Sequence, residues 1–275
     1  MQDRNLFSIT LSSLFVASCL MAAAQTAAPP PPPNVLVIDR EYLKPGMSGS
    51  PHIRTESAYV KANMDANWPT HYIAMDSMSG PNRALFLFAY DSFAAWGKDQ
   101  EAQNANAQLS AANDAAALAD GQLLTESQAH VFLYHPEMSV HSSVDIPHAR
   151  YWEMTSFVIK PGHEAAWTKL TKIYTDGFAS IPDAHWATYE SIYGENNGGV
   201  WVVINPMRSL DEVDKGMANS RQFQTALGES GMKDAADLAA DCIQSVQTNL
   251  FTVNPKMSYP NPDWAKAAPE LWAQH

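Results

Sequence analysis

The stretch LKPG at residues 43–46 returns as IKPG at residues 159–162 of a 275-residue chain. Two longer stretches repeat in the same order and at nearly the same offset: HYIAMDSMSG (71–80) as HWATYESIYG (185–194), and FLYHPEMS (132–139) as FTVNPKMS (251–258). Three matches in one order predict a single structural unit that is written twice. The repeat determines the architecture far better than the activity.

The periodicity of apolar residues is clearest in the second unit. It predicts strands at 151–159, 186–193, 200–204 and 250–253, and helices at 163–178, from 209 onward, and from about 233 to 247. The SLDE sequence at 209–212 is typical of a capped helix start. The first unit has the same order, with a longer alanine-rich helical region at 92–128. The order β-α-β-β-α-β is that of a ferredoxin-like module.

A module of this kind has helices on one face of its sheet only, so the other face needs a partner. The FVIKPG stretch at 157–162, followed by a helix that carries Trp167, resembles the dimeric α+β barrel superfamily. The nearest groups are the antibiotic-biosynthesis monooxygenases and the NIPSNAP proteins. The resemblance covers about 34–139 and 149–258. It implies an α+β protein in which two tandem ferredoxin-like modules form an intrachain barrel, with a pocket under the helices or inside the barrel.

The N-terminus is typical of an export signal. Arg4 precedes an apolar run at 6–21, and three alanines stand before Gln25. The alternative is a lipoprotein signal, because the VASC sequence at 16–19 suits a lipid anchor at Cys19. Both interpretations predict export. Ordinary cleavage predicts a periplasmic or extracellular protein, and lipidation predicts a membrane-anchored lipoprotein. After cleavage of the signal peptide Cys242 is the single cysteine, so no internal disulfide is expected.

The sequence divides accordingly into six parts. We expect a signal peptide (1–24), a proline-rich spacer (25–33), module 1 (34–139), a linker (140–148), module 2 (149–258) and a C-terminal tail (259–275) that packs across the surface.

The net charge of -12 argues against a nucleic-acid partner, which would need clustered Lys and Arg. The sequence also contains no glycine-rich phosphate loop, no nucleophile elbow and no dinucleotide fingerprint. These functional classes are therefore not expected.

Carboxylates on two strands are candidates for general bases. Strand alternation places Asp39 and Glu41 on one side of the first strand and Glu153 on the equivalent side of the strand at 151–159. If the apolar sides meet the helices, these three carboxylates point into the barrel, where burial raises a carboxyl pKa. The alternative is that they pair with arginines or water near the strand ends.

His71 and His185 occupy equivalent positions and are the weak candidates for acid/base catalysis, with Glu190 as a further supporting carboxylate. Alternation separates each histidine from the carboxylate of its own strand, so no ready dyad is expected. Another group, His130, His135, His141 and His148, matches no familiar zinc spacing, and no metal site is expected there.

Two classes of function remain open. The resemblance implies a cofactor-free monooxygenase that acts on a small apolar or aromatic molecule. Haem is the alternative cofactor, because the superfamily includes haem-degrading enzymes. The alternative is a non-catalytic protein of the cell envelope that binds a small molecule or has a structural role. Ionisable groups in a roomy pocket favour the enzyme, a dry aromatic pocket favours binding, and a filled barrel favours the structural role. Whether the chain is an enzyme, and whether it forms further homo-oligomers, is not decided by the sequence.

Overall fold

The computed structural model describes residues 28–194 and 199–272. The predicted signal peptide and Cys19 lie outside the described residues. Within the described ranges, no helix has the length and apolar character needed to cross a membrane.

The predicted order of elements occurs twice. The first half contains β1 (Val35–Leu43), α1 (Ser50–Asp65), β2 (Tyr72–Ser77), β3 (Arg83–Tyr90), α2 (Phe93–Ala105), α3 (Ala107–Asp120) and β4 (Leu124–Tyr134). The second half contains β5 (Tyr151–Ile159), α4 (Glu164–Phe178), β6 (Ala187–Tyr193), β7 (Val200–Met207), α5 (Asp211–Cys242) and β8 (Ile243–Val253). The predicted α+β class with two ferredoxin-like modules is confirmed.

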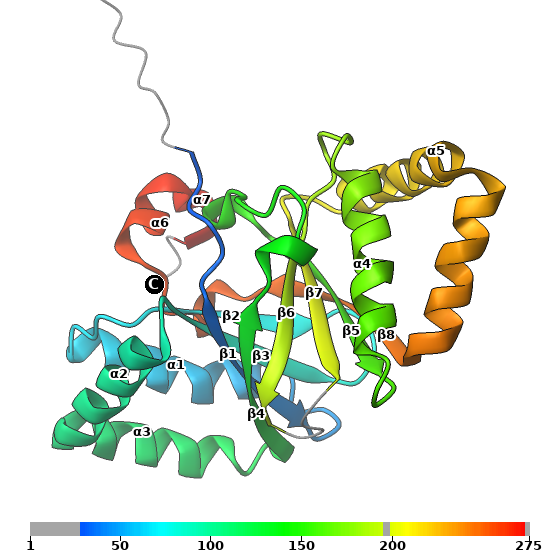
Figure 1. Ribbon diagram of the computed structural model, residues 1–275. Coiled ribbons are helices and arrows are strands. Elements are labelled where there is room, and N and C mark those ends of the chain that lie inside the picture. The colour runs from blue at the N-terminus through cyan, green and yellow to red at the C-terminus, as the bar shows by residue number, and fades with distance from the viewer. Residues whose placement is uncertain (1–27, 195–198, 273–275) are drawn as a thin grey trace, which may run out of the picture.

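The eight strands close into one antiparallel barrel in the order β1-β3-β2-β8-β5-β7-β6-β4. Each half contributes four neighbouring strands, and the halves join where β2 pairs with β8 and β4 pairs with β6. The helices lie outside the barrel, α1 to α3 against the first half and α4 and α5 against the second (Figure 1). Each half thus buries the inner face of its sheet against the other half, as the tandem arrangement predicts.

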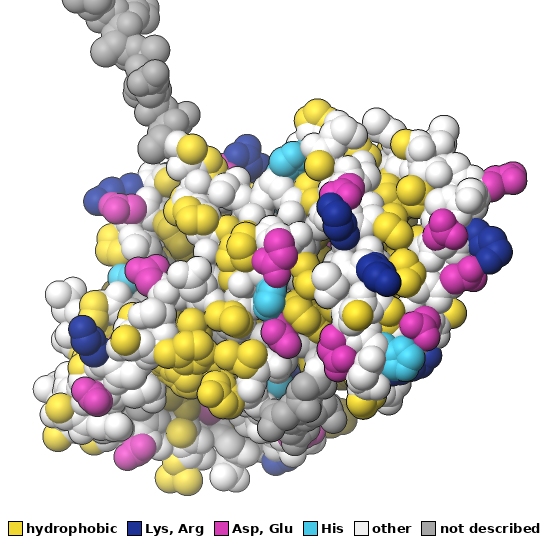
Figure 2. Space-filling model, viewed as in Figure 1, with side chains coloured by type: hydrophobic (Ala, Val, Ile, Leu, Met, Phe, Trp, Pro, Cys, Tyr) yellow, Lys and Arg dark blue, Asp and Glu magenta, His cyan; other side chains and the backbone are white. Residues whose placement is uncertain are grey.

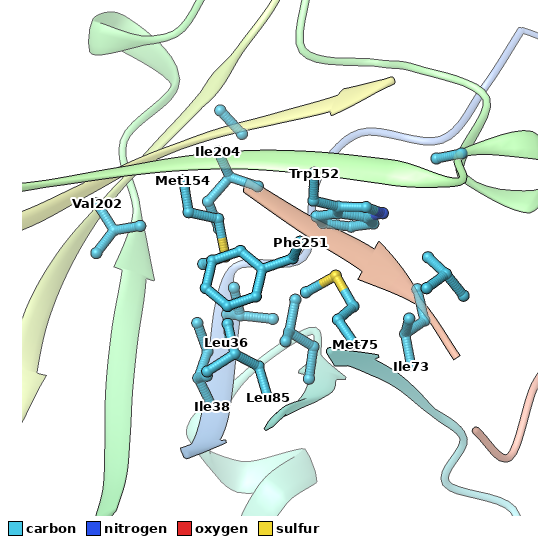
Figure 3. Close-up of a cluster of buried hydrophobic side chains, with 14 of the residues drawn as sticks. Leu36, Ile38, Ile73, Met75, Leu85, Trp152, Met154, Val202, Ile204 and Phe251 are labelled. Atoms are coloured by element: carbon cyan, nitrogen blue, oxygen red, sulfur yellow. The ribbon is translucent and has the colours of Figure 1, made fainter. Parts of the chain in front are cut away.

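The barrel interior is filled with apolar side chains. Strands of both halves direct these residues toward one another (Figure 3): Leu36, Ile38, Ile73, Met75, Leu85, Trp152, Met154, Val202, Ile204 and Phe251. The prediction that Asp39, Glu41 and Glu153 face the interior is therefore wrong. An eight-stranded barrel is just wide enough for its own side chains, so the interior takes the apolar side of each strand. The carboxylates lie on the outer face, under the helices.

Two predicted helix ends are also wrong. The helical region predicted to reach residue 128 ends at Asp120, and the helix predicted to reach 247 ends at Cys242. The residues that follow begin β4 and β8, whose first halves carry exposed, mostly polar side chains. Backbone pairing with β1 and β5 extends these strands beyond the apolar alternation that the sequence displays.

The C-terminal tail does more than cover the surface. It forms α6 (Pro262–Ala267) and α7 (Pro269–Trp272), and Leu271 and Trp272 belong to the same buried cluster as the barrel interior. The Trp272 indole donates a hydrogen bond to the Pro147 carbonyl at 2.8 Å. The predicted surface packing is corrected accordingly, because burying this large ring stabilises the core more than leaving it in water.

Candidate functional site

A cleft of about 530 Å³ lies over the outer face of the second half-sheet. Glu153 of β5 and Asn205 of β7 form part of its floor, His185 and Trp186 come from the segment before β6, and residues 212–220 of α5 form the opposite wall. The helix turns away from the cleft at Gly228, whose φ of 69° interrupts α5. Residues 212–220 in the first part of α5 border the cleft, whereas the second part runs beside α4 (Figure 1).

The floor of the cleft is polar. Glu153 and Asn205 are direct partners in the β5–β7 register, so their side chains share one face of the sheet. Burial raises the pKa of the Glu153 carboxyl above its ordinary value. Asn205 Oδ1 is buried and has no hydrogen-bond partner within the described part of the chain. A neighbouring carboxyl and an unsatisfied amide can together receive a ligand that carries a polar group.

One wall of the cleft is aromatic. Phe178, at the end of α4, meets the Trp186 ring edge-on with 5.4 Å between centroids. Phe223 of α5 stacks behind Phe178 at 4.7 Å. This wall offers a flat apolar surface beside the polar floor, which suits a small molecule with an aromatic or apolar body.

His185 borders the cleft but is tied to the backbone. Its Nε2 lies 2.7 Å from the Pro206 carbonyl oxygen, and its Nδ1 lies 3.2 Å from the Asp183 carbonyl oxygen. The ring therefore connects the segment before β6 to β7. To act as an acid or base, it would have to give up one of these contacts.

In the first half, Glu41 meets three residues that the sequence analysis did not single out: His52 and Glu56 of α1, and Asp120 at the end of α3. The His52 Nε2 atom lies 3.0 Å from Glu41 Oε2, 3.6 Å from Asp120 Oδ1 and 3.9 Å from Glu56 Oε1. Burial, followed by repulsion from Glu41 and Asp120, raises the pKa of Glu56 to about 10. We call these four residues the buried cluster.

Asp39 lies two residues before Glu41, on the same outer face of β1. Burial, and secondarily the charge of Glu41, raise the pKa of Asp39 to about 6. The structure therefore places two of the predicted carboxylates, Asp39 and Glu41, on the outer face of β1 and not in the barrel interior.

The helical part of the cluster had a signal in the sequence. His52, Glu56 and Val60 are spaced by four residues and form the buried stripe of α1. A histidine and a glutamate on such a stripe are unusual, because charged groups are rarely buried without partners. Asp120 is far away in the sequence, and only the packing of α3 on α1 brings it there.

The remaining two candidates lie elsewhere. His71 precedes β2 and packs on the Tyr259 ring at 4.6 Å, and burial lowers the pKa of its imidazole. Glu190 Oε2 lies 3.2 Å from His135 Nε2, whose ring meets Trp201 edge-on. Of the predicted residues, only Glu153 and His185 share the cleft.

No protein-family model matches the sequence, and no curated protein matches it. Solved structures do match. A "putative monooxygenase" from Lactobacillus acidophilus is 11% identical, with a TM-score of 0.50, and the match covers 80% of this chain and 93% of that one. A "putative monooxygenase" from Fusobacterium nucleatum is 12% identical, with a TM-score of 0.51 and coverages of 81% and 93%.

An "anthrone oxidase-like protein" is 10% identical, with a TM-score of 0.50 and coverages of 80% and 91%. At such identities the likeness concerns the fold alone. It confirms the α+β barrel fold that the resemblance implies.

Proposed function

We propose that this chain is an exported protein that binds a small aromatic or apolar molecule in the cleft and oxidises it as a cofactor-free monooxygenase does. The observation that carries the proposal is the Glu153 carboxyl, with its raised pKa, beside the buried Asn205 amide and facing an aromatic wall. The fold shared with the monooxygenase-named structures supports it. The leader-like sequence at 1–24 supports export.

The chemistry requires a substrate with an acidic C–H bond next to a carbonyl or phenol. Glu153 is the general base that takes this proton, since a carboxyl with a raised pKa is a better base near neutral pH. The Asn205 amide, turned so that its NH₂ faces the cleft, donates to the oxygen that becomes negative. The resulting carbanion is oxidised by O₂. One oxygen atom enters the product as a carbonyl in place of CH₂ and the other leaves as water, so no external reductant is needed.

Haem does not fit the cleft through its histidine. An axial ligand needs a free nitrogen, and both ring nitrogens of His185 face backbone carbonyls.

The second candidate is a binding protein without catalysis that uses the same cleft. The tied His185 ring favours it, because this histidine is then not free to exchange protons with a ligand beside Glu153. The filled interior favours a structural role for the barrel itself, and leaves the cleft as the place for a ligand.

Oxygen uptake in the presence of anthrone-type and phenolic substrates tests the proposal. The mature wild type should consume O₂, and Glu153→Gln should lower kcat by about 100-fold or more while still binding substrate. Glu126→Gln, which removes an exposed carboxylate on β4, is the matched control and should keep full activity. Binding without oxygen uptake in the wild type would support the binding protein instead. Absence of binding to the cleft would contradict both.

A further inference from the structure

The geometry of the buried cluster is that of a ligand set. One atom from each of Glu41, His52, Glu56 and Asp120 lies within 4.8 Å of all the others. Around His52 Nε2 the three carboxylate oxygens stand at 3.0, 3.6 and 3.9 Å. Donors held about 2.1 Å from a tetrahedral cation are about 3.4 Å apart, so these separations match four ligands around one ion.

Burial makes the cluster costly without a cation. His52, Glu56 and Asp120 are 0%, 3% and 2% exposed, and Glu41 is the one near the surface. In the described ranges, no Lys or Arg forms an ion pair with these carboxylates, and the one basic group beside them is the His52 imidazole. Buried carboxylates are normally paired or bound to a metal.

One side-chain oxygen in the cluster is unsatisfied. Glu56 Oε1 is buried, has no hydrogen-bond partner in the part of the chain that the structure describes, and faces His52 Nε2. By contrast, Asp120 is held in place, because the Thr55 hydroxyl donates to its Oδ1 at 2.6 Å. The hydrogen bond from Thr55 orients the Asp120 carboxylate, as is usual for a metal ligand. The unsatisfied Glu56 oxygen beside it is free to bind a cation.

The second half shows that the fold does not need charges at this place. By the repeat, Glu41 corresponds to Phe157, and their partners on the neighbouring strands are Ala84 and Trp201. In the second half the space between sheet and first helix is filled by rings, with Trp167 5.1 Å from Phe157 and 5.8 Å from Trp201. In the first half, the small Ala84 leaves room and ionisable groups occupy it.

We infer that the buried cluster binds one divalent cation through His52 Nε2 and the carboxylates of Glu41, Glu56 and Asp120. Three carboxylates and one imidazole suit Mn²⁺, Fe²⁺ or Zn²⁺ better than a metal that prefers thiolates. The ligands come from β1, α1 and α3, and three of them are buried. The ion therefore ties two helices to the barrel and has no role in reaching a substrate in the cleft.

Metal analysis of the mature chain, purified without a histidine tag and stripped with EDTA, tests this inference. We expect one equivalent of Zn²⁺ or Mn²⁺ to bind on titration. At a free metal concentration 100-fold above Kd, we expect Tm to rise by about 5 to 10 °C. Glu56→Gln keeps the shape of the side chain but cannot become a carboxylate ligand, and should weaken binding by about 100-fold or more, as should His52→Ala.

The matched controls are His163→Gln and Glu126→Gln, which remove a partly exposed histidine and an exposed carboxylate away from the buried cluster and should bind like the wild type. A near-ultraviolet circular dichroism spectrum establishes whether each variant is folded. Two results would overturn the inference: a stripped wild type whose Tm does not change with either metal, or a folded Glu56→Gln variant that binds as tightly as the wild type.

Discussion

The His52 Nε2 atom lies 3.0 Å from Glu41 Oε2, and this contact joins α1 to the outer face of β1. Both side chains are largely shielded from water, and the imidazole is the one ion-pair partner that Glu41 has in the described chain. Ionisable side chains therefore lie between the sheet and the first helix in the first half. The second half has aromatic packing at the same place.

The contact predicts a large loss of stability when the imidazole is removed. Without His52, the Glu41 carboxylate loses its imidazole partner, and the buried Asp120 carboxylate loses its nearest ring nitrogen. His52→Ala should lower the free energy of unfolding by about 3 to 5 kcal/mol, the usual cost of leaving a buried charge unpaired. Urea denaturation measures it. His163→Ala, which removes a partly exposed imidazole beside the exposed Asp241, should change the value by less than about 1 kcal/mol. Equal effects of the two substitutions would refute the argument.

Replacing Asp99 should lower the free energy of unfolding nearly as much as replacing His52. Its carboxylate accepts hydrogen bonds from the Trp68 indole (3.0 Å), the Thr70 hydroxyl (2.6 Å) and the Tyr90 hydroxyl (2.9 Å). Asp99→Ala leaves these donors unsatisfied and should cost about 3 kcal/mol or more. Asp91→Ala, an exposed aspartate, is the control for denaturation. A loss below 1 kcal/mol at Asp99 would show that water replaces the carboxylate.

Gly177 keeps the aromatic wall of the cleft in place. A Cβ atom there would clash with the Phe223 ring, whereas at Gly97, also within a helix, a Cβ would meet nothing within 4 Å. Gly177→Ala should therefore destabilise by about 1 to 3 kcal/mol, while Gly97→Ala should stabilise by about 0.5 to 1 kcal/mol. Thermal unfolding of both variants checks the opposite signs. Stabilisation by both would mean that Phe223 moves aside freely.

The raised pKa of Glu153 predicts a pH dependence of stability. Because its pKa is higher in the folded state than the ordinary 4.5, the folded protein binds this proton more tightly than the unfolded chain does. The stabilisation is complete below the unfolded pKa and is lost as pH rises through the folded pKa. Glu153→Gln lacks this loss, so its Tm should rise relative to wild type as the pH increases above the ordinary carboxyl pKa of 4.5. A constant difference across this range would contradict the pKa direction.

Trp272 is expected to be part of the core rather than of a loose tail. Its side chain is 1% exposed and lies in the barrel cluster. Trp272→Ala should cost about 3 to 5 kcal/mol, as for other buried aromatic residues. Trp264, which is only partly buried beside it, should cost less when replaced in the same way. Urea denaturation measures the two losses in the free energy of unfolding. Equal losses would contradict the deeper burial of Trp272.

The sequence by itself determined the repeated β-α-β-β-α-β order, because strand alternation, helical spacing and the Lys-Pro-Gly turns are local signals. The closure of the two halves into one barrel was expected from the family resemblance, and the structure shows it. Only the tertiary structure decided which face of β1 is dry. Alternation places Leu36 and Asp39 on opposite faces of β1 but does not say which face points into the barrel. The narrow interior admits only apolar side chains, so the face with Leu36 points inward. The same holds for the sites. His52 and Glu56 share a visible helical stripe, but their meeting with Asp120, like that of Glu153 with His185, depends on long-range packing that no local pattern encodes.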